Sequence, residues 1–165
     1  METAIPFMLV PFKEQDYADY RALTSNPKIM EMITGRPLSE QESRAHFDRL
    51  LQQNQVAEGF GNFRIISEDN NAFMGLAKLI RQQLEDKEVE IGFLLMEQFQ
   101  GKGIASAATR QLIDFARKDR SLLRVKAILD PLNSASRKIL VREGFVSEFV
   151  GEIDGLPGEV MSLVL

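Results

Sequence analysis

The sequence predicts an α/β or α+β fold, in which helices pack against one central sheet. Segments typical of strands alternate along the chain with segments typical of helices, and no internal repeat or linker separates them. The chain has 165 residues, of which 44% are hydrophobic and 27% are charged, a composition typical of one ordinary globular domain. A chain of this length buries enough surface to fold without a disulfide or a structural metal.

The N-terminal third is expected to hold a strand and two helices. An apolar strand is expected at residues 7–12. A helix over 14–25 follows and ends before Pro27, because the residue before a proline avoids the α region. Ser39 and Glu42 are spaced as a capping box, in which each side chain binds the backbone amide of the other residue. This pair predicts the start of the second helix.

The middle of the chain is expected to form a meander of three strands. Residues 62–67 and 73–80 are apolar segments separated by a short polar turn. Residues 88–95 alternate between apolar and other side chains, the period-2 pattern of a strand. The period then changes, since apolar residues recur at i, i+4, i+8 and i+11 over 104–115. That spacing predicts an amphipathic helix.

The C-terminal third predicts a strand, a short helix and a final pair of strands. Gly144 follows the helix at a position where a glycine often ends one. The expected segments, in chain order, are a strand at 122–129, a helix at 133–142, a strand at 145–150, a loop at 151–158 and a strand at 159–165.

Composition excludes several classes of chemistry. The chain has no cysteine and a single histidine, His46, so a thiolate nucleophile and a multi-histidine metal site are ruled out, and we expect no metal. The net charge of −4 argues against a nucleic-acid partner, which needs a concentrated basic face. The start of the chain lacks the pattern of a signal peptide, and no apolar run approaches the ~20 residues of a membrane span. We therefore expect a cytoplasmic protein with no membrane partner.

A glycine-rich turn lies between the strand at 88–95 and the helix that follows. Gly101 and Gly103 allow a tight turn and let the backbone approach a ligand closely. Free amides at a helix start can hold a phosphate, although the same glycines are also typical of a plain strand-to-helix turn. The spacing fits neither a Walker loop nor the dinucleotide fingerprint, which would have its third glycine where Ser106 stands.

Six segments match the motifs of one known family. They are, in chain order, residues 11–16, Asn26-Pro27, 90–95 (EIGFLL), 98–105 (QFQGKGIA), 130–136 (DPLNSAS) and Gly144-Phe145. Together they resemble the GCN5-related N-acetyltransferases (GNAT), and in particular the subgroup with the ribosomal-protein N-terminal acetyltransferases (RimJ/RimL type). The resemblance implies a single GNAT domain over 1–165. Its fold would be a central, mostly antiparallel mixed sheet of about six to seven strands with about four helices.

The resemblance also implies a site for acetyl-CoA. The amides of the glycine turn would hold the pyrophosphate, and the strand at 93–95 would pair with the pantetheine arm where neighbouring strands splay apart. Gly92 suits such a site, although a β-bulge would explain it as well. Asn133 would bind the pantetheine arm, or would only cap its helix. Arg137 would reach the 3′-phosphate of CoA, or would only be a surface residue of the helix. The implied cofactor-binding residues are Phe93, Leu94, Leu95, Gln100, Gly101, Lys102, Gly103, Ile104, Ala105, Asn133 and Arg137.

The catalytic groups follow from the same resemblance. In the subgroup, a serine at the place of Ser136 is positioned to protonate the departing thiolate, and an exposed helix serine is the plain alternative. Many family members use a tyrosine where this chain has Leu140. The amine must lose a proton before it attacks, and a carboxylate would suffice as the base. The candidates are Glu90 on the cofactor strand and three residues near the last hairpin, Glu152, Asp154 and Glu159. A sheet-surface charge is the alternative for Glu90 and a plain loop residue for the other three, and a mechanism without a base stays open.

We therefore expect an acetyl-CoA-dependent N-acetyltransferase, in which a primary amine attacks the thioester directly in a ternary complex. The acceptor would be a protein or peptide N-terminus or a small molecule, such as a polyamine, an amino acid or an antibiotic. A catalytically weak acetyl-CoA-binding sensor is an alternative of another class, because the tyrosine is missing. Both a monomer and a homodimer agree with the sequence.

Overall fold

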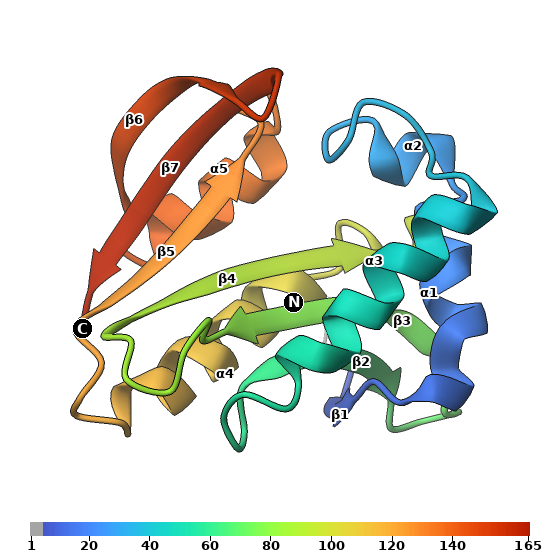
Figure 1. Cartoon of the computed structure of the whole chain (residues 1–165), viewed down its shortest axis with the longest axis horizontal. Helices are drawn as coiled ribbons and strands as arrows, with labels where there is room; N and C mark the ends of the chain where they lie inside the picture. The colour runs from blue at the N-terminus through green and yellow to red at the C-terminus, as the bar shows by residue number, and fades with distance from the viewer. Residues whose placement is uncertain (1–4) are drawn as a thin grey trace.

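The computed structural model describes residues 5–165, and Figure 1 shows how its elements are arranged. The strands are β1 (Phe7–Pro11), β2 (Gly61–Ser67), β3 (Phe73–Ile80), β4 (Glu88–Leu95), β5 (Arg124–Leu129), β6 (Val146–Ile153) and β7 (Leu156–Val164). The α-helices are α1 (Tyr17–Thr24), α2 (Pro27–Met30), α3 (Glu40–Gln53), α4 (Ile104–Arg117) and α5 (Ser134–Arg142). Two 3-10 turns, η1 (Glu14–Asp16) and η2 (Glu97–Phe99), complete the described elements.

The strands form one mixed sheet in the order β1-β2-β3-β4-β5-β7-β6. All neighbours in this sheet run antiparallel except β4 and β5, which run parallel. These two strands pair over only three positions, from Glu88 opposite Arg124 to Glu90 opposite Lys126. Beyond Glu90 they diverge, and Figure 1 shows the gap widening away from the end that they share. The expected α/β (α+β) fold with a splayed, mostly antiparallel sheet is confirmed.

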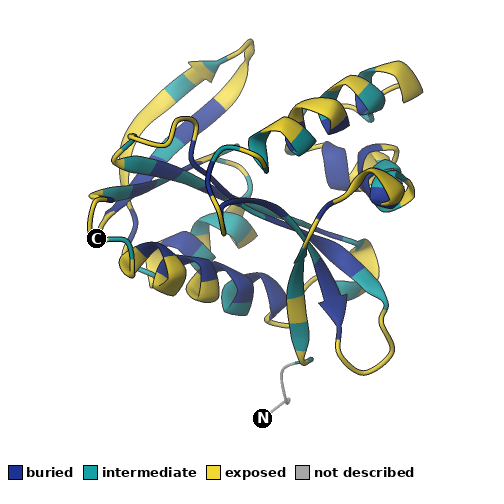
Figure 2. Cartoon of the chain, turned by 60° about the horizontal axis from the view of Figure 1, so that its bottom comes forward, coloured by how far each residue is buried: buried dark blue, intermediate teal, exposed yellow. Residues whose placement is uncertain are grey.

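Helices cover both faces of the sheet, as Figure 2 shows. The apolar stripe of α4 is buried against β3, β4 and β5, and Leu140 of α5 joins this first core. On the other face, α1, α2 and α3 enclose a second core around Phe47. Side chains of β4 reach both cores, with Ile91 buried in the first and Leu94 packed against the second. The strand that borders the gap is therefore packed on both faces.

Two local details differ from the sequence prediction. Pro27 begins α2 instead of only ending α1, because the Asn26 side chain accepts hydrogen bonds from two backbone amides of the next turn and caps the new helix. Phe115, expected on the buried stripe of α4, is 36% exposed and packs edge-on against Phe60.

The segment at 151–158, expected as a loop, is mostly strand. β6 and β7 pair as far as Ile153 opposite Leu156, so the connection is only two residues long. Asp154 and Gly155 form it with φ angles of 52° and 81°. An Asp-Gly pair favours a two-residue hairpin turn. Because the turn here is so short, the two strands stay paired past Gly151 and Gly158 up to Ile153 and Leu156.

Candidate active site

The strand β4 directs backbone donors into the gap beside β5. In an antiparallel pair, residues that bond to the neighbouring strand alternate with residues that point away from it. The amide of Met96 donates to the carbonyl of Met74 at 2.9 Å, so Leu94, two residues earlier, also bonds toward β3. Phe93 and Leu95 therefore direct their amides away from β3 and toward the gap. Three strand residues were predicted to bind the cofactor, and only Phe93 and Leu95 have backbone amides that face the gap.

The glycine turn leads from this strand into α4. Gly101 and Gly103 have φ angles of 74° and 80°, in the left-handed region that favours glycine. A Cβ atom at either position would meet no heavy atom within 4 Å, so the space beside the turn is open. The first helical bond runs from the Ala107 amide to the Gly103 carbonyl, and no residue between 5 and 165 accepts from the backbone amides of 101–106. Unsatisfied amides around an open space form a site suited to a phosphate group.

The other predicted residues of this turn contribute in different ways. The side-chain amide of Gln100 donates to the Leu95 carbonyl at 3.2 Å, so it braces the turn against the end of β4. Lys102 is exposed, whereas the side chains of Ile104 and Ala105 are buried in the core. Only the backbone of these two residues is free to serve a ligand.

Asn133 and Ser136 lie in the first turn of α5, directly after β5 ends. Asn133 Oδ1 accepts from the Ser136 amide at 3.2 Å, which confirms the capping role kept as an alternative above. A contact between the Asn133 side chain and pantetheine stays a prediction. Ser136 is half-buried, whereas Leu140, at the position of the family's tyrosine, is 3% exposed and lies in the first core.

Arg137 forms an ion pair with a buried carboxylate. Its Nε lies 3.0 Å from Glu159 Oε1 and its Nη2 lies 3.3 Å from Oε2. Burial alone would raise the pKa of Glu159, but hydrogen bonds from Arg137 and Ser147 outweigh it and hold the pKa below its usual value. Two nitrogens of Arg137 are thus engaged within the protein, and its contact with a 3′-phosphate stays a prediction. The sequence placed Glu159 near the last hairpin but did not pair it with α5.

Glu90 lies at the closed end of the gap. Its Oε2 is 2.8 Å from Lys78 Nζ. A Cβ at position 92 would lie 2.7 Å from Lys78 Cε, so Gly92 leaves room for the lysine side chain to cross it. The register of β3 and β4 runs without a shift, which rules out the bulge considered for Gly92. Lys78 was missed in the sequence analysis, although it is the one charged residue in the apolar segment 73–80.

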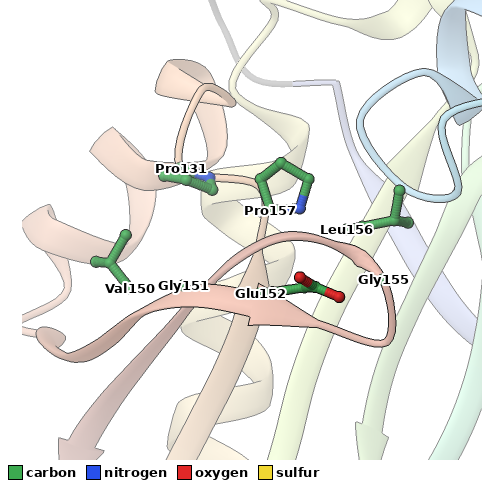
Figure 3. Close-up of a pocket in the computed structure, with 7 residues that line it drawn as sticks. All are labelled: Pro131, Val150, Gly151, Glu152, Gly155, Leu156 and Pro157. Atoms are coloured by element: carbon green, nitrogen blue, oxygen red, sulfur yellow. The ribbon is translucent and has the colours of Figure 1, made fainter.

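Glu152 lines a shallow pocket at the tip of the β6–β7 hairpin (Figure 3). The pocket has a volume of about 370 Å³ and is lined by Pro131, Val150, Gly151, Glu152, Gly155, Leu156 and Pro157. Glu152 is the one ionisable residue in this lining, and it is exposed. Leu156 Cδ2 lies 3.8 Å from where a Cβ of Gly35 would stand, so the hairpin tip also meets the loop between α2 and α3. Glu152 and Glu90 thus lie on separate parts of the sheet.

Residues 5–165 contain neither a cluster of metal-ligating side chains nor a membrane-spanning helix. No group of three or more His, Asp and Glu side chains in this range is arranged to hold a metal ion. No helix among these residues has the length and apolar character needed to cross a membrane. The absence of a metal and the cytoplasmic location both stay predictions.

Known acetyltransferases resemble the chain over most of its length. The family model for the acetyltransferase (GNAT) domain matches residues 7–146. The uncharacterized N-acetyltransferase YnaD of Bacillus subtilis is 25% identical over 146 residues, which are 84% of this chain and 82% of that protein.

Solved structures share the fold at low sequence identity. Spermidine N-acetyltransferase from Vibrio cholerae, in complex with CoA and spermine, matches with a TM-score of 0.78 at 19% identity, over 96% of this chain and 95% of that one. RimL, a ribosomal L7/L12 α-N-protein acetyltransferase in complex with coenzyme A, matches with a TM-score of 0.78 at 20% identity, over 99% and 98%. With the family model covering most of the sequence, this chain belongs to the acetyltransferase (GNAT) domain family of N-acetyltransferases.

Proposed function

We propose that this chain transfers the acetyl group of acetyl-CoA to a primary amine, and that residues 1–165 act as one domain in this reaction. The observation that carries the proposal is that two sets of free backbone amides lie close together in the chain. Phe93 and Leu95 direct amides into the gap beside β4, and the unsatisfied amides of 101–106 follow after the short 3-10 turn η2. A ligand with an amide-bearing arm at one end and a diphosphate at the other suits this series.

Different backbone amides and side chains along the gap have different roles in the proposed reaction. Acetyl-CoA, when bound, supplies an activated acetyl thioester. An amide of Phe93 or Leu95 donates to the thioester oxygen as negative charge develops there, and one such preorganised donor contributes roughly 3–4 kcal/mol in other acyl-transfer sites. Asn133 binds the pantetheine arm through its side-chain amide. The Ser136 hydroxyl gives its proton to the departing thiolate and regains one from solvent. No residue becomes acetylated, since the amine attacks directly.

The base is assigned by position along β4. Phe93 is the third residue after Glu90, which places it about 10 Å further along an extended strand. Glu90 therefore acts through a water molecule and not by direct contact with the amine. Glu152, at the hairpin pocket, is suited to attract the ammonium form of the acceptor before it loses its proton. Both roles are proposals that rest on placement in the sheet.

The acceptor class is a primary amine, carried by a protein or peptide N-terminus or by a small molecule. The hairpin pocket supports an amine with an apolar group next to it, because one carboxylate stands among proline, valine, leucine and glycine residues. The RimJ/RimL-type motifs at 130–136 support a protein N-terminus, as in the RimL structure. A polyamine is the second candidate, supported by the likeness to the spermidine enzyme.

A calorimetric titration with acetyl-CoA, followed by a thiol-release assay on the same sample, tests the function. We expect saturable binding with about one molecule per chain, and thiol release that depends on an added amine. The panel should contain peptides with different N-termini, spermidine and an aminoglycoside. Absence of binding would overturn the proposal. Binding without release for any amine would favour the sensor alternative instead.

A further inference from the structure

The buried carboxylate of Glu159 takes no part in the proposed reaction. Glu159 is 1% exposed and lies on β7, opposite Leu129 at the end of β5 and Val150 on β6. Arg137 of α5 approaches it with two bonds, of 3.0 Å and 3.3 Å, one to each carboxylate oxygen. A two-bond pair of this kind fixes the direction of approach as well as the distance.

No side chain in the first turn of α5 is buried. Leu140 is the one buried residue of the helix, and it lies in the second half. Residues 134–136 are exposed or half-exposed. Arg137 directly follows Ser136 and lies one turn after Asn133, on the same side of the helix. The ion pair to β7 therefore sets where these two side chains stand relative to the gap.

We propose that Glu159 is a positioning residue for Asn133 and Ser136, because its carboxylate, through Arg137, holds the first turn of α5 against β7 at the open end of the gap. This inference rests on the function proposed above for those two side chains. A buried carboxylate such as Glu159 is costly to desolvate, and its ion pair stabilises a fold no better than a well-packed apolar contact would. The two-bond pair adds a fixed orientation, which a reacting group needs and an apolar contact does not supply.

Amide hydrogen exchange tests the anchoring without any need for activity. Glu159→Gln keeps the shape of the side chain and removes its charge. It should raise the exchange rates of the amides of 136–138 by about tenfold, and leave those of 141–143 within about twofold. Arg137→Lys, at a half-exposed site, keeps the positive charge but cannot form both bonds, so it should give the same local change. Unchanged rates at 136–138 in both variants would overturn the proposal.

The matched control breaks the ion pair at the other end of the same helix. Glu143 lies 3.0 Å from Arg110 of α4. Glu143→Gln should leave the exchange rates at 136–138 unchanged. A rise there equal to that in Glu159→Gln would mean that any lost ion pair loosens α5, and would count against a specific role for Glu159.

Kinetics then separate positioning from general stability. Glu159→Gln should lower kcat about tenfold at saturating acetyl-CoA, because a small displacement of a reacting group is costly. In a Ser136→Ala background, again at saturating acetyl-CoA, it should lower kcat no further, since the displaced hydroxyl is already gone and a displaced Asn133 would weaken acetyl-CoA binding instead. Losses that multiply would overturn the proposal. If the wild type neither binds acetyl-CoA nor turns over, the proposed function fails, and the exchange rates still decide the anchoring.

Discussion

The ammonium of Lys78 and the carboxylate of Glu90 meet 2.8 Å apart, at the last position where β4 pairs with β5. The lysine side chain reaches this point by crossing Gly92. The two side chains are 34% and 23% exposed, so solvent screens the pair and its contribution to stability is below about 1 kcal/mol. These two charges therefore add little to the stability of the fold.

Glu90→Gln tests the proposed base. The amide keeps the shape of the carboxylate but cannot take a proton, so kcat should fall about 100-fold while the dissociation constant of acetyl-CoA stays within about twofold. Steady-state kinetics and calorimetry measure these quantities. Lys78→Met is the control, because it leaves the carboxylate in place and should cost much less. Turnover of Glu90→Gln close to the wild-type rate would remove Glu90 from the mechanism.

Gly103→Val tests the glycine turn. Valine at a φ of 80° costs about 1–2 kcal/mol of backbone strain, and its side chain fills the open space beside the unsatisfied amides. Acetyl-CoA binding should be lost. Gly155→Val is a matched control, since Gly155 has a φ of 81° and equally open surroundings at the hairpin tip. The control should bind acetyl-CoA normally, and normal binding by Gly103→Val would refute the turn as the pyrophosphate site.

Ser136→Ala tests the proposed acid. Without its hydroxyl, the thiolate must leave unprotonated or take a proton from water, so kcat should drop at least tenfold. The affinity for acetyl-CoA should not change. Ser134→Ala, in the same turn and fully exposed, should behave as the wild type. Equal rates for the two variants would leave Ser136 with no part in the reaction.

Acid unfolding tests the Glu159 ion pair. The pKa of Glu159 is held below its usual value, because hydrogen bonds from Arg137 and Ser147 outweigh the opposing effect of burial. A carboxyl with a lowered pKa stabilises the fold above its unfolded pKa, about 4.3, and this stability is lost as the pH falls through the folded value. Each unit of pKa difference corresponds to about 1.4 kcal/mol. Urea unfolding from pH 7 to about 3 should therefore show a steeper loss for the wild type than for Glu159→Gln, and parallel curves would contradict this.

Local patterns were enough to predict most of the fold. The capping box of Ser39 and Glu42 begins α3 as expected, and the period-2 segment at 88–95 is β4. The change to helical spacing at Ile104 marks the first residue of α4. These features depend on neighbours in the sequence, so the sequence alone contains them. The Asp154-Gly155 turn was equally local, but all of 151–158 was expected as a loop and the turn was missed.

Contacts between distant segments could not be predicted in the same way. Lys78 and Glu90 meet because β3 and β4 pair in one particular register, and a shift of one residue would turn the lysine to the other face. The pairing of Arg137 with Glu159 depends on how α5 packs over β7. The site residues were therefore suggested by motif, while the groups that hold them in place became visible only in three dimensions.

The short junction between β4 and β5 makes the width of the gap sensitive to the angle between these two strands. The strands are joined at three paired positions ending at Glu90, called here the fulcrum, and Leu95 lies five residues further along β4. Five extended residues span about 16 Å, so a rotation of about 5° at the fulcrum displaces the far end by ~1.4 Å. Arg124 and Lys126 both bind Glu88 at this fulcrum. A small change in angle at the paired end is therefore magnified at the open end.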